Sequence, residues 1–121
     1  MDRTFALLGA LSAFIAVAAG AFGAHGLKSK LTPELLAVFE TGARYHFYHS
    51  LALFAVAWLA SRDAPGATAA GASFLGGIVL FSGSLYALAL TGARWMGAIT
   101  PVGGLALLLG WLCLAWRVSR G

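Results

Sequence analysis

The chain has few charged side chains: eight Lys or Arg and four Asp or Glu among 121 residues, which is 10%. A water-soluble domain of this size carries roughly 25% charged residues, so this share is too small to cover a surface facing water. Hydrophobic residues make up 60% of the chain. The composition therefore excludes an ordinary soluble domain and indicates a protein whose solvent is lipid.

Other absences narrow the functional classes. Cys113 is the single cysteine, so the chain forms no intrachain disulfide and no cysteine-based metal site. It has no basic run interleaved with aromatic residues, which argues against nucleic-acid binding. Ser-His-Asp arrangements, paired intramembrane carboxylates, glycine-rich nucleotide loops and His-Glu-x-x-His helices are also missing. We therefore expect that the protein is not an enzyme and that it binds no cofactor, no metal and no nucleic acid.

Uncharged runs divide the chain into four candidate membrane spans. They cover about residues 4–24, 45–61, 67–93 and 95–116. A helix needs ~20 apolar residues to cross a ~30 Å hydrocarbon core, and the second run is at the short end of that range. Helices are expected because backbone amides facing lipid must be satisfied within their own segment. The sequence thus predicts one all-α domain over residues 1–121, an integral membrane bundle of four transmembrane helices.

The connection between the first two spans carries its own helix signals. Thr32 is suited to be an N-cap, Pro33 to be the first helical residue, and Glu34 is favoured by the helix dipole. From these we expect a short helix lying in the membrane interface, with Gly42 as the bend into the second span.

The sequence does not establish whether the first span is cleaved as a signal peptide, and its charges do not establish the orientation of the chain in the membrane. Ala19-Gly20-Ala21 has small residues of the kind a signal peptidase cleaves, but the apolar run exceeds a typical signal-peptide core, so we favour a retained span. Four Lys or Arg fall on each side of the membrane, so the positive-inside rule gives no orientation. The tryptophans at 95, 111 and 116 are candidates for interfacial aromatic belts.

Small residues at fourfold spacing predict where the helices pack, because close approach drives association in lipid. Ser73 with Gly77, and Gly83 with Ala87, form two such pairs in the third span. A longer stripe in the first span consists of Ser12, Ala16, Gly20 and Ala24.

An antiparallel order of spans gathers most of the unusual polar side chains toward one membrane face. We call this predicted cluster the polar mouth; its members are His25, Arg44, Tyr45, His46, His49, Ser84, Tyr86 and Thr100. Tyr45, His46 and His49 share roughly one helix face, since they stand three or four residues apart. Glu40 precedes Arg44 by four residues, the favoured order for an ion pair.

The histidines admit several interpretations. His25, His46 and His49 could ligate a metal or haem, since neutral imidazole is the commonest metal ligand. They could instead form a proton relay or a small-solute pathway. We favour a third interpretation, in which interfacial histidines and tyrosines anchor helix ends or form a satisfied hydrogen-bond network between helices. Binding of a lipid headgroup or a partner is the fourth.

Together these considerations predict a noncatalytic small membrane component that binds lipid or a protein partner through the polar mouth. The expected partners are membrane lipid and a homo-oligomer or larger membrane complex. A small-solute or proton-linked transporter or channel is the first alternative, and a metal-binding or haem-binding membrane protein is the second.

Four motifs in register resemble a known family. They are Gly20 to Leu27 (GAFGAHGL), Tyr45 to Leu53 (YHFYHSLAL), Phe81 to Tyr86 (FSGSLY) and Ile99 to Gly104 (ITPVGG). They resemble the small membrane proteins called domain of unknown function 423, or uncharacterised protein family 0382, which has bacterial inner-membrane members and an animal relative, transmembrane protein 256. The resemblance implies a four-helix membrane bundle in a bacterial inner membrane. It implies no activity.

Overall fold

The structure is a computed structural model that describes residues 2–120, and within that range it is helical with no strand. The five α-helices are α1 (Arg3–Phe22), α2 (Pro33–Ala60), α3 (Ala67–Gly77), α4 (Gly83–Thr91) and α5 (Thr100–Ser119). Two π-helical segments, η1 (Gly23–Leu27) and η2 (Ile78–Ser82), and one 3₁₀ segment, η3 (Arg94–Ala98), complete the described chain. Because η2 joins α3 to α4 without a break, the chain forms four rods, and the predicted all-α class is confirmed.

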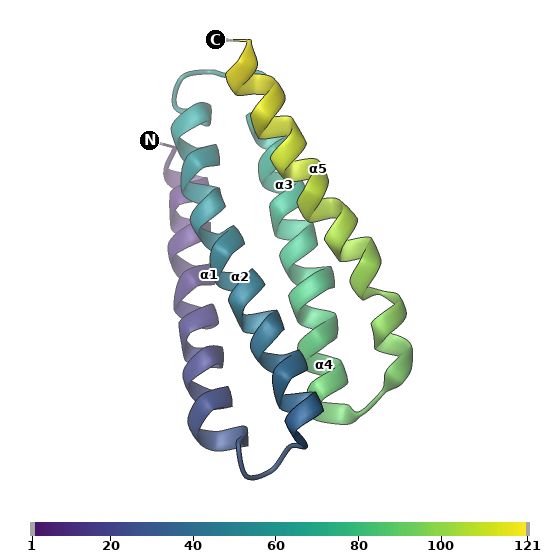
Figure 1. The fold of residues 1–121 in the computed structure, drawn as a ribbon. Coiled ribbons are helices and arrows are strands. Elements are labelled where there is room, and N and C mark those ends of the chain that lie inside the picture. The colour runs from purple at the N-terminus through teal and green to yellow at the C-terminus, as the bar shows by residue number, and fades with distance from the viewer. Residues whose placement is uncertain (1, 121) are drawn as a thin grey trace.

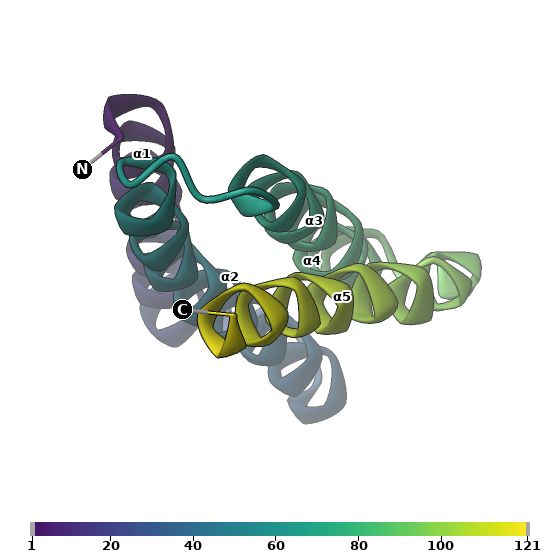
Figure 2. The same cartoon turned by 90° about the horizontal axis from the view of Figure 1, so that it is seen from above.

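The rods run up and down beside one another, as Figure 1 shows, with the N- and C-terminal ends near the same end of the bundle. We call that end the upper end; the connections after η1 and after α4 lie at the lower end. Seen along the bundle in Figure 2, α1 pairs with α2, and the α3–η2–α4 rod pairs with α5. In Figure 1, α5 diverges from α2 toward the lower end.

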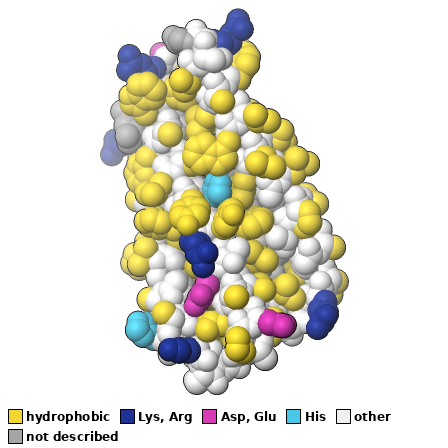
Figure 3. All heavy atoms as spheres, in the orientation of Figure 1, with side chains coloured by type: hydrophobic (Ala, Val, Ile, Leu, Met, Phe, Trp, Pro, Cys, Tyr) yellow, Lys and Arg dark blue, Asp and Glu magenta, His cyan; other side chains and the backbone are white. Residues whose placement is uncertain are grey.

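Three helical segments have the length and hydropathy of membrane spans: Arg3–Leu27, Ala67–Thr91 and Arg94–Ser119. They present apolar side chains outward, as Figure 3 shows for one face, where Lys and Arg lie mostly toward the two ends. The exposed apolar residues of α1 and α5 include Leu7, Leu11, Phe14, Ile15, Val17, Val102, Leu105, Leu108, Leu109 and Leu112. These surfaces are suited to contact lipid.

Helix α2 is more polar than the other three rods, yet it lies against α1, α3 and α4 and contributes many buried residues. Its 28 residues span about 42 Å at ~1.5 Å per residue, enough to cross a ~30 Å core. A polar helix is tolerated in a membrane bundle when neighbouring helices cover its polar side chains. Helix α2 is therefore the shared core helix of the bundle.

The start of α2 corrects one prediction. Thr32 is the N-cap, since its Oγ1 accepts a hydrogen bond from Leu35 N at 3.2 Å, and Pro33 is the first helical residue, as predicted. However, the helix then runs unbroken to Ala60, so the prediction of a separate interfacial helix is wrong, whereas the start of the second span near Tyr45 stays a prediction. Gly42 does not bend the chain. A Cβ there would lie 3.2 Å from Leu85 Cβ, so the glycine instead lets α4 approach α2 closely.

The small-residue seams are confirmed in part. A Cβ on Gly77 would collide with Leu107, and one on Gly103 would collide with the backbone of Phe81, so α5 packs tightly on the α3–η2–α4 rod through glycines. At Gly20 and Gly83, in contrast, no atom of a neighbouring helix within residues 2–120 lies within 4 Å of such a Cβ, so these two predicted contact positions are wrong. In lipid both faces of a helix are apolar, so spacing alone does not tell a packed small residue from one that faces lipid.

Candidate functional site

The two histidines of α2 lie halfway along the bundle instead of at its mouth. Since α2 begins at Pro33 and ends at Ala60, His46 and His49 occupy its central turns. Each side chain is 6% exposed. The sequence predicts them toward one end of the bundle, because a span is expected to begin near Tyr45, but the helix begins twelve residues earlier and places them near its middle.

His46 belongs to a hydrogen-bond network that joins three rods. Its Nδ1 lies 2.9 Å from Tyr86 Oη on α4, and its Nε2 lies 3.0 Å from Ser12 Oγ on α1. Ser12 Oγ is 2.6 Å from Ser50 Oγ, and Ser50 donates to the His46 carbonyl oxygen at 2.7 Å. We call these four residues the His46 network.

The proton positions in the His46 network follow from the Ser50 hydroxyl, because the direction of its hydrogen bond is fixed. Because the Ser50 hydroxyl donates to a carbonyl, which only accepts, Ser50 Oγ must accept from Ser12. The Ser12 proton is thereby used, so Ser12 Oγ accepts from the Nε2–H of His46. Nδ1 of the neutral ring is then an acceptor, and Tyr86 donates to it. One directed chain of hydrogen bonds runs from Tyr86 through His46 and Ser12 to Ser50.

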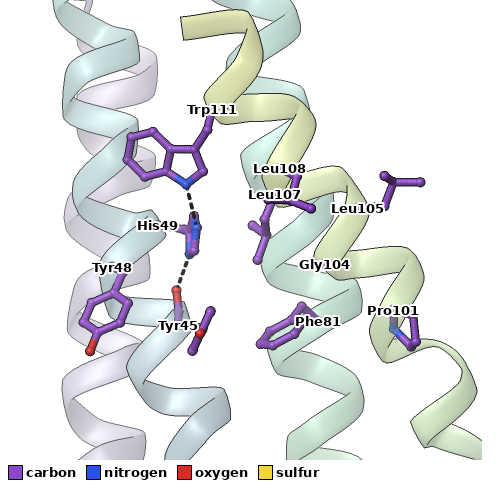
Figure 4. A pocket seen from close by; sticks show the side chains of 10 residues that line it. All are labelled: Tyr45, Tyr48, His49, Phe81, Pro101, Gly104, Leu105, Leu107, Leu108 and Trp111. Carbon is purple, nitrogen blue, oxygen red and sulfur yellow. Dashed lines mark hydrogen bonds between the residues drawn. The ribbon is translucent and has the colours of Figure 1, made fainter. Parts of the chain in front are cut away.

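His49 makes a second connection with the opposite tautomer. Trp111 Nε1, which only donates, lies 3.0 Å from His49 Nε2, so that nitrogen is the acceptor. Nδ1 carries the proton and donates to the Tyr45 carbonyl oxygen at 2.7 Å. Figure 4 shows the side chains of Trp111 and His49 bridging α5 and α2. Both ring nitrogens of each buried histidine are therefore occupied by protein groups.

His25 does not join the other histidines. It lies exposed in η1, whereas His46 is level with Ser12 on α1. The thirteen residues from Ser12 to His25 correspond to about 20 Å along a helix. Within residues 2–120 no group of three His, Cys, Asp or Glu side chains is placed to hold a metal ion. The alternative in which His25, His46 and His49 ligate a metal together is therefore contradicted, because η1 and the middle of α2 lie at different levels of the bundle.

The remaining residues of the predicted polar mouth divide among separate contacts. Ser84 Oγ lies 2.6 Å from Thr100 Oγ1 and joins α4 to the start of α5. Tyr45 packs against Phe81, with ring centroids 5.0 Å apart. Arg44 lines a small hollow against α1 together with Glu40, and their ion pair stays a prediction. Six of the eight residues thus form separate interhelical contacts instead of one site, whereas His25 lies apart and Arg44 lines the hollow against α1.

A large hollow lies where α5 diverges from α2, and we call it the α2/α5 groove. Its volume is about 800 Å³. Figure 4 shows its lining: Tyr45, Tyr48 and His49 from α2, Phe81 from η2, and Pro101, Gly104, Leu105, Leu107, Leu108 and Trp111 from α5. Apart from His49, the two tyrosine hydroxyls and the Trp111 N–H that donates to His49, these side chains are apolar. The groove is therefore suited to an apolar occupant.

Sequence reasoning found only the α2 wall of the groove. Trp111 is predicted at the membrane interface, but it lies in the central turns of α5, with its ring in the groove. The available signal was the spacing of Leu105, Leu108 and Trp111, which puts three large apolar side chains on one helix face, with Gly104 leaving room beside them. The same spacing fits any lipid-facing stripe, so it does not single out a groove.

Comparisons with known proteins match nearly the whole chain to one protein family. Residues 19–104 match the family described as "Protein of unknown function (DUF423)". The chain is 48% identical over 114 residues to the UPF0382 membrane protein YwdK of Bacillus subtilis, which covers 93% of each chain. It is 46% identical over 116 residues to a UPF0382 membrane protein of Haemophilus influenzae, covering 96% of this chain and 94% of the relative. No solved structure matches it.

Proposed function

Since the chain belongs to the DUF423 family, the UPF0382 membrane proteins, we propose that it is a noncatalytic multi-pass membrane component that binds lipid acyl chains in the α2/α5 groove. The observation that carries the proposal is the groove itself. Pockets for small ligands commonly measure ~300–1,000 Å³ with mostly apolar walls, and the groove is about 800 Å³.

The surroundings of the groove favour an acyl chain as the occupant. Leu105 and Leu108 line the groove and are 57% and 62% exposed, so the groove opens sideways onto the surface suited to lipid. The abundant apolar molecule at that surface is the acyl chain of a lipid. His49 offers no free ring nitrogen to a polar ligand, because Trp111 and Tyr45 occupy both.

The polar network supports a binding role over catalysis or proton transport. Each hydroxyl and ring nitrogen that we traced from Tyr86 to Ser50 is used within the protein. The chain ends at the carbonyl oxygen of His46, which accepts protons in hydrogen bonds but does not pass them on. We therefore assign the network to holding α1, α2 and α4 together.

Photolabelling tests the proposal directly. The protein is reconstituted with a phosphatidylcholine that carries a diazirine at the end of one acyl chain, irradiated, and mapped by peptide mass spectrometry. We expect labels to concentrate on the groove walls, above all on Leu105 and Leu108. Equal labelling of these residues and of Leu7, Phe14 and Val17 on the outer face of α1 would contradict the proposal.

A pair of glycine substitutions provides the matched control. Gly104 lines the groove, and a Cβ there would lie 3.6 Å from Phe81, an ordinary contact, so Gly104→Leu should fold and fill the groove. Gly76 lies outside the groove and also has free space around it. We expect Gly104→Leu to abolish groove labelling and Gly76→Leu to preserve it.

A further inference from the structure

Two arginines meet at the upper end of the same helix pair. Arg62 follows the end of α2, and Arg117 lies in the last turn of α5. Together they line a hollow of about 400 Å³, whose other walls are Trp58, Leu59, Ala64 and Val118. We call it the arginine hollow. It brings two guanidinium groups to one place at the edge of the lipid-facing surface.

The side chain of Arg117 is only partly satisfied within the protein. Its Nε is buried and lacks a hydrogen-bond partner in the described chain. A cation in the last turn complements the helix dipole, but that role leaves this N–H unpaired. A buried donor without an acceptor costs about 1–3 kcal/mol, so such a group calls for an explanation. An acceptor supplied by a ligand in the hollow would satisfy it.

The charge in the arginine hollow is positive. The Arg62 guanidinium lies over the Trp58 ring, with Cζ 5.0 Å from the ring centroid, which leaves its edges for an anion. Asp63 follows Arg62 in the chain but is not part of the lining. Asp2, near the same end of the bundle, accepts a hydrogen bond from Phe5 N and caps α1. Two guanidinium groups without a lining carboxylate are suited to a phosphate, which they bind through paired N–H donors.

An apolar surface connects the arginine hollow to the α2/α5 groove. A second hollow of about 390 Å³ lies directly below it between the same two helices. This second hollow shares Trp58, Leu59 and Val118 with the arginine hollow, and it shares Trp111 with the groove. A molecule with a charged head and an apolar tail would therefore find a continuous binding surface along α2 and α5.

The dimensions match one leaflet of a bilayer. Half of a ~30 Å hydrocarbon core is ~15 Å, or about ten residues of helix. Counted from Arg117, that distance reaches Leu107, which lines the groove beyond Trp111. We infer that Arg62 and Arg117 bind the phosphate of an anionic phospholipid whose acyl chain runs past Trp111 into the groove. The inference rests on the proposed function and adds the headgroup class.

Binding of phosphatidylglycerol to single-arginine variants tests the inference. The full chain is purified in detergent, and its affinity for dioleoyl phosphatidylglycerol and for dioleoyl phosphatidylcholine is measured by native mass spectrometry. We expect tighter binding of phosphatidylglycerol, and a loss of about tenfold in Arg62→Gln and in Arg117→Gln. Arg120→Gln is the matched control, because Arg120 lies at the same end, over Trp116, and does not line the hollow. It should retain the affinity within about twofold.

Three outcomes would overturn the inference. Unchanged affinity in Arg62→Gln and Arg117→Gln would remove the hollow as the site. An equal loss in Arg120→Gln would mean attraction to the general positive charge of that end. Displacement of phosphatidylglycerol by millimolar inorganic phosphate, with the same stabilisation from phosphate alone, would assign the hollow to free phosphate.

Neutral photolabelled phosphatidylcholine separates this inference from the proposed function. If the arginine variants keep groove labelling while the wild-type chain shows no preference for phosphatidylglycerol, the headgroup inference alone fails. If neither the wild-type protein nor any of the variants shows groove labelling, the proposed acyl-chain site fails as well.

Discussion

The indole N–H of Trp111 donates to Nε2 of His49 across 3.0 Å, and this hydrogen bond joins α5 to α2 at the middle of the bundle. These two residues are 62 positions apart in the chain. The bond lies where α5 begins to diverge from α2, and its donor Trp111 lines both the groove below and the apolar hollow above. It therefore holds together the two helices whose separation creates the proposed lipid site.

Trp111→Phe should destabilise the bundle by about 1–2 kcal/mol. The phenyl ring keeps most of the apolar contact, but His49 Nε2 loses the one donor that it has within residues 2–120 and stays buried. Reversible unfolding by sodium dodecyl sulfate in mixed micelles, followed by circular dichroism, measures the change. Trp95→Phe is the control, because Trp95 is 68% exposed, and a loss of stability there as large as at Trp111 would contradict the assignment.

The two buried histidines should be opposite tautomers. The hydrogen-bond donors and acceptors around them put the proton of His46 on Nε2 and the proton of His49 on Nδ1. Nitrogen-15 NMR of histidine-labelled protein distinguishes these forms, with exposed His25 as the reference signal. Finding the same tautomer at both rings would refute the traced proton arrangement.

Gly42→Ala and Gly83→Ala should change stability in opposite directions. A Cβ at Gly42 lies 3.1 Å from the Tyr86 ring, which His46 holds in place, so we expect a loss of about 1–3 kcal/mol. Gly83 is helical with free space beside it, so alanine there should stabilise by about 0.4–1 kcal/mol. The unfolding assay measures both, and a stabilising Gly42→Ala would mean that α4 does not pack on α2 at this point.

Alanine substitution should lower the stability of the bundle at His46 but not at His25. His46→Ala leaves the Tyr86 hydroxyl and Ser12 without their partner, which we expect to cost about 1–3 kcal/mol. His25→Ala removes an exposed side chain outside both networks, so stability should stay within about 0.5 kcal/mol. Equal losses in the two variants, measured by the same unfolding titration, would show that His25 contributes to the packed bundle.

Local signals in the sequence predicted the start of α2 and one close contact correctly, but not the role of Gly42. Thr32 and Pro33 start α2 as expected, because capping depends only on residues within one helical turn. Gly77 lies at a close contact, as its spacing from Ser73 predicts. The bend at Gly42 was wrong, because a glycine in a helix serves equally as a hinge or as a contact point, and only the approach of α4 decides between them.

The candidate site was predicted in its residue types but not in its geometry. His46, His49, Tyr45 and Tyr86 all take part in interhelical contacts, whereas His25 lies apart from them. Ser12 was expected only as a small packing residue, yet it supplies the hydroxyl that accepts from His46. Partners 34 to 62 residues apart in the chain are not marked by any local spacing.

The sequence by itself determined the solvent, the helical class and the up-and-down order of the rods. A chain with so few charged residues must be surrounded by lipid, and in lipid its backbone must form helices. Short connections require consecutive helices to run antiparallel. Only the tertiary structure decided how each helix is rotated about its axis, and hence which side chains meet His46, His49 and Arg117. In lipid the outward and inward faces of a helix are both apolar, so rotation is set by interhelical packing and hydrogen bonds instead of by hydrophobic pattern.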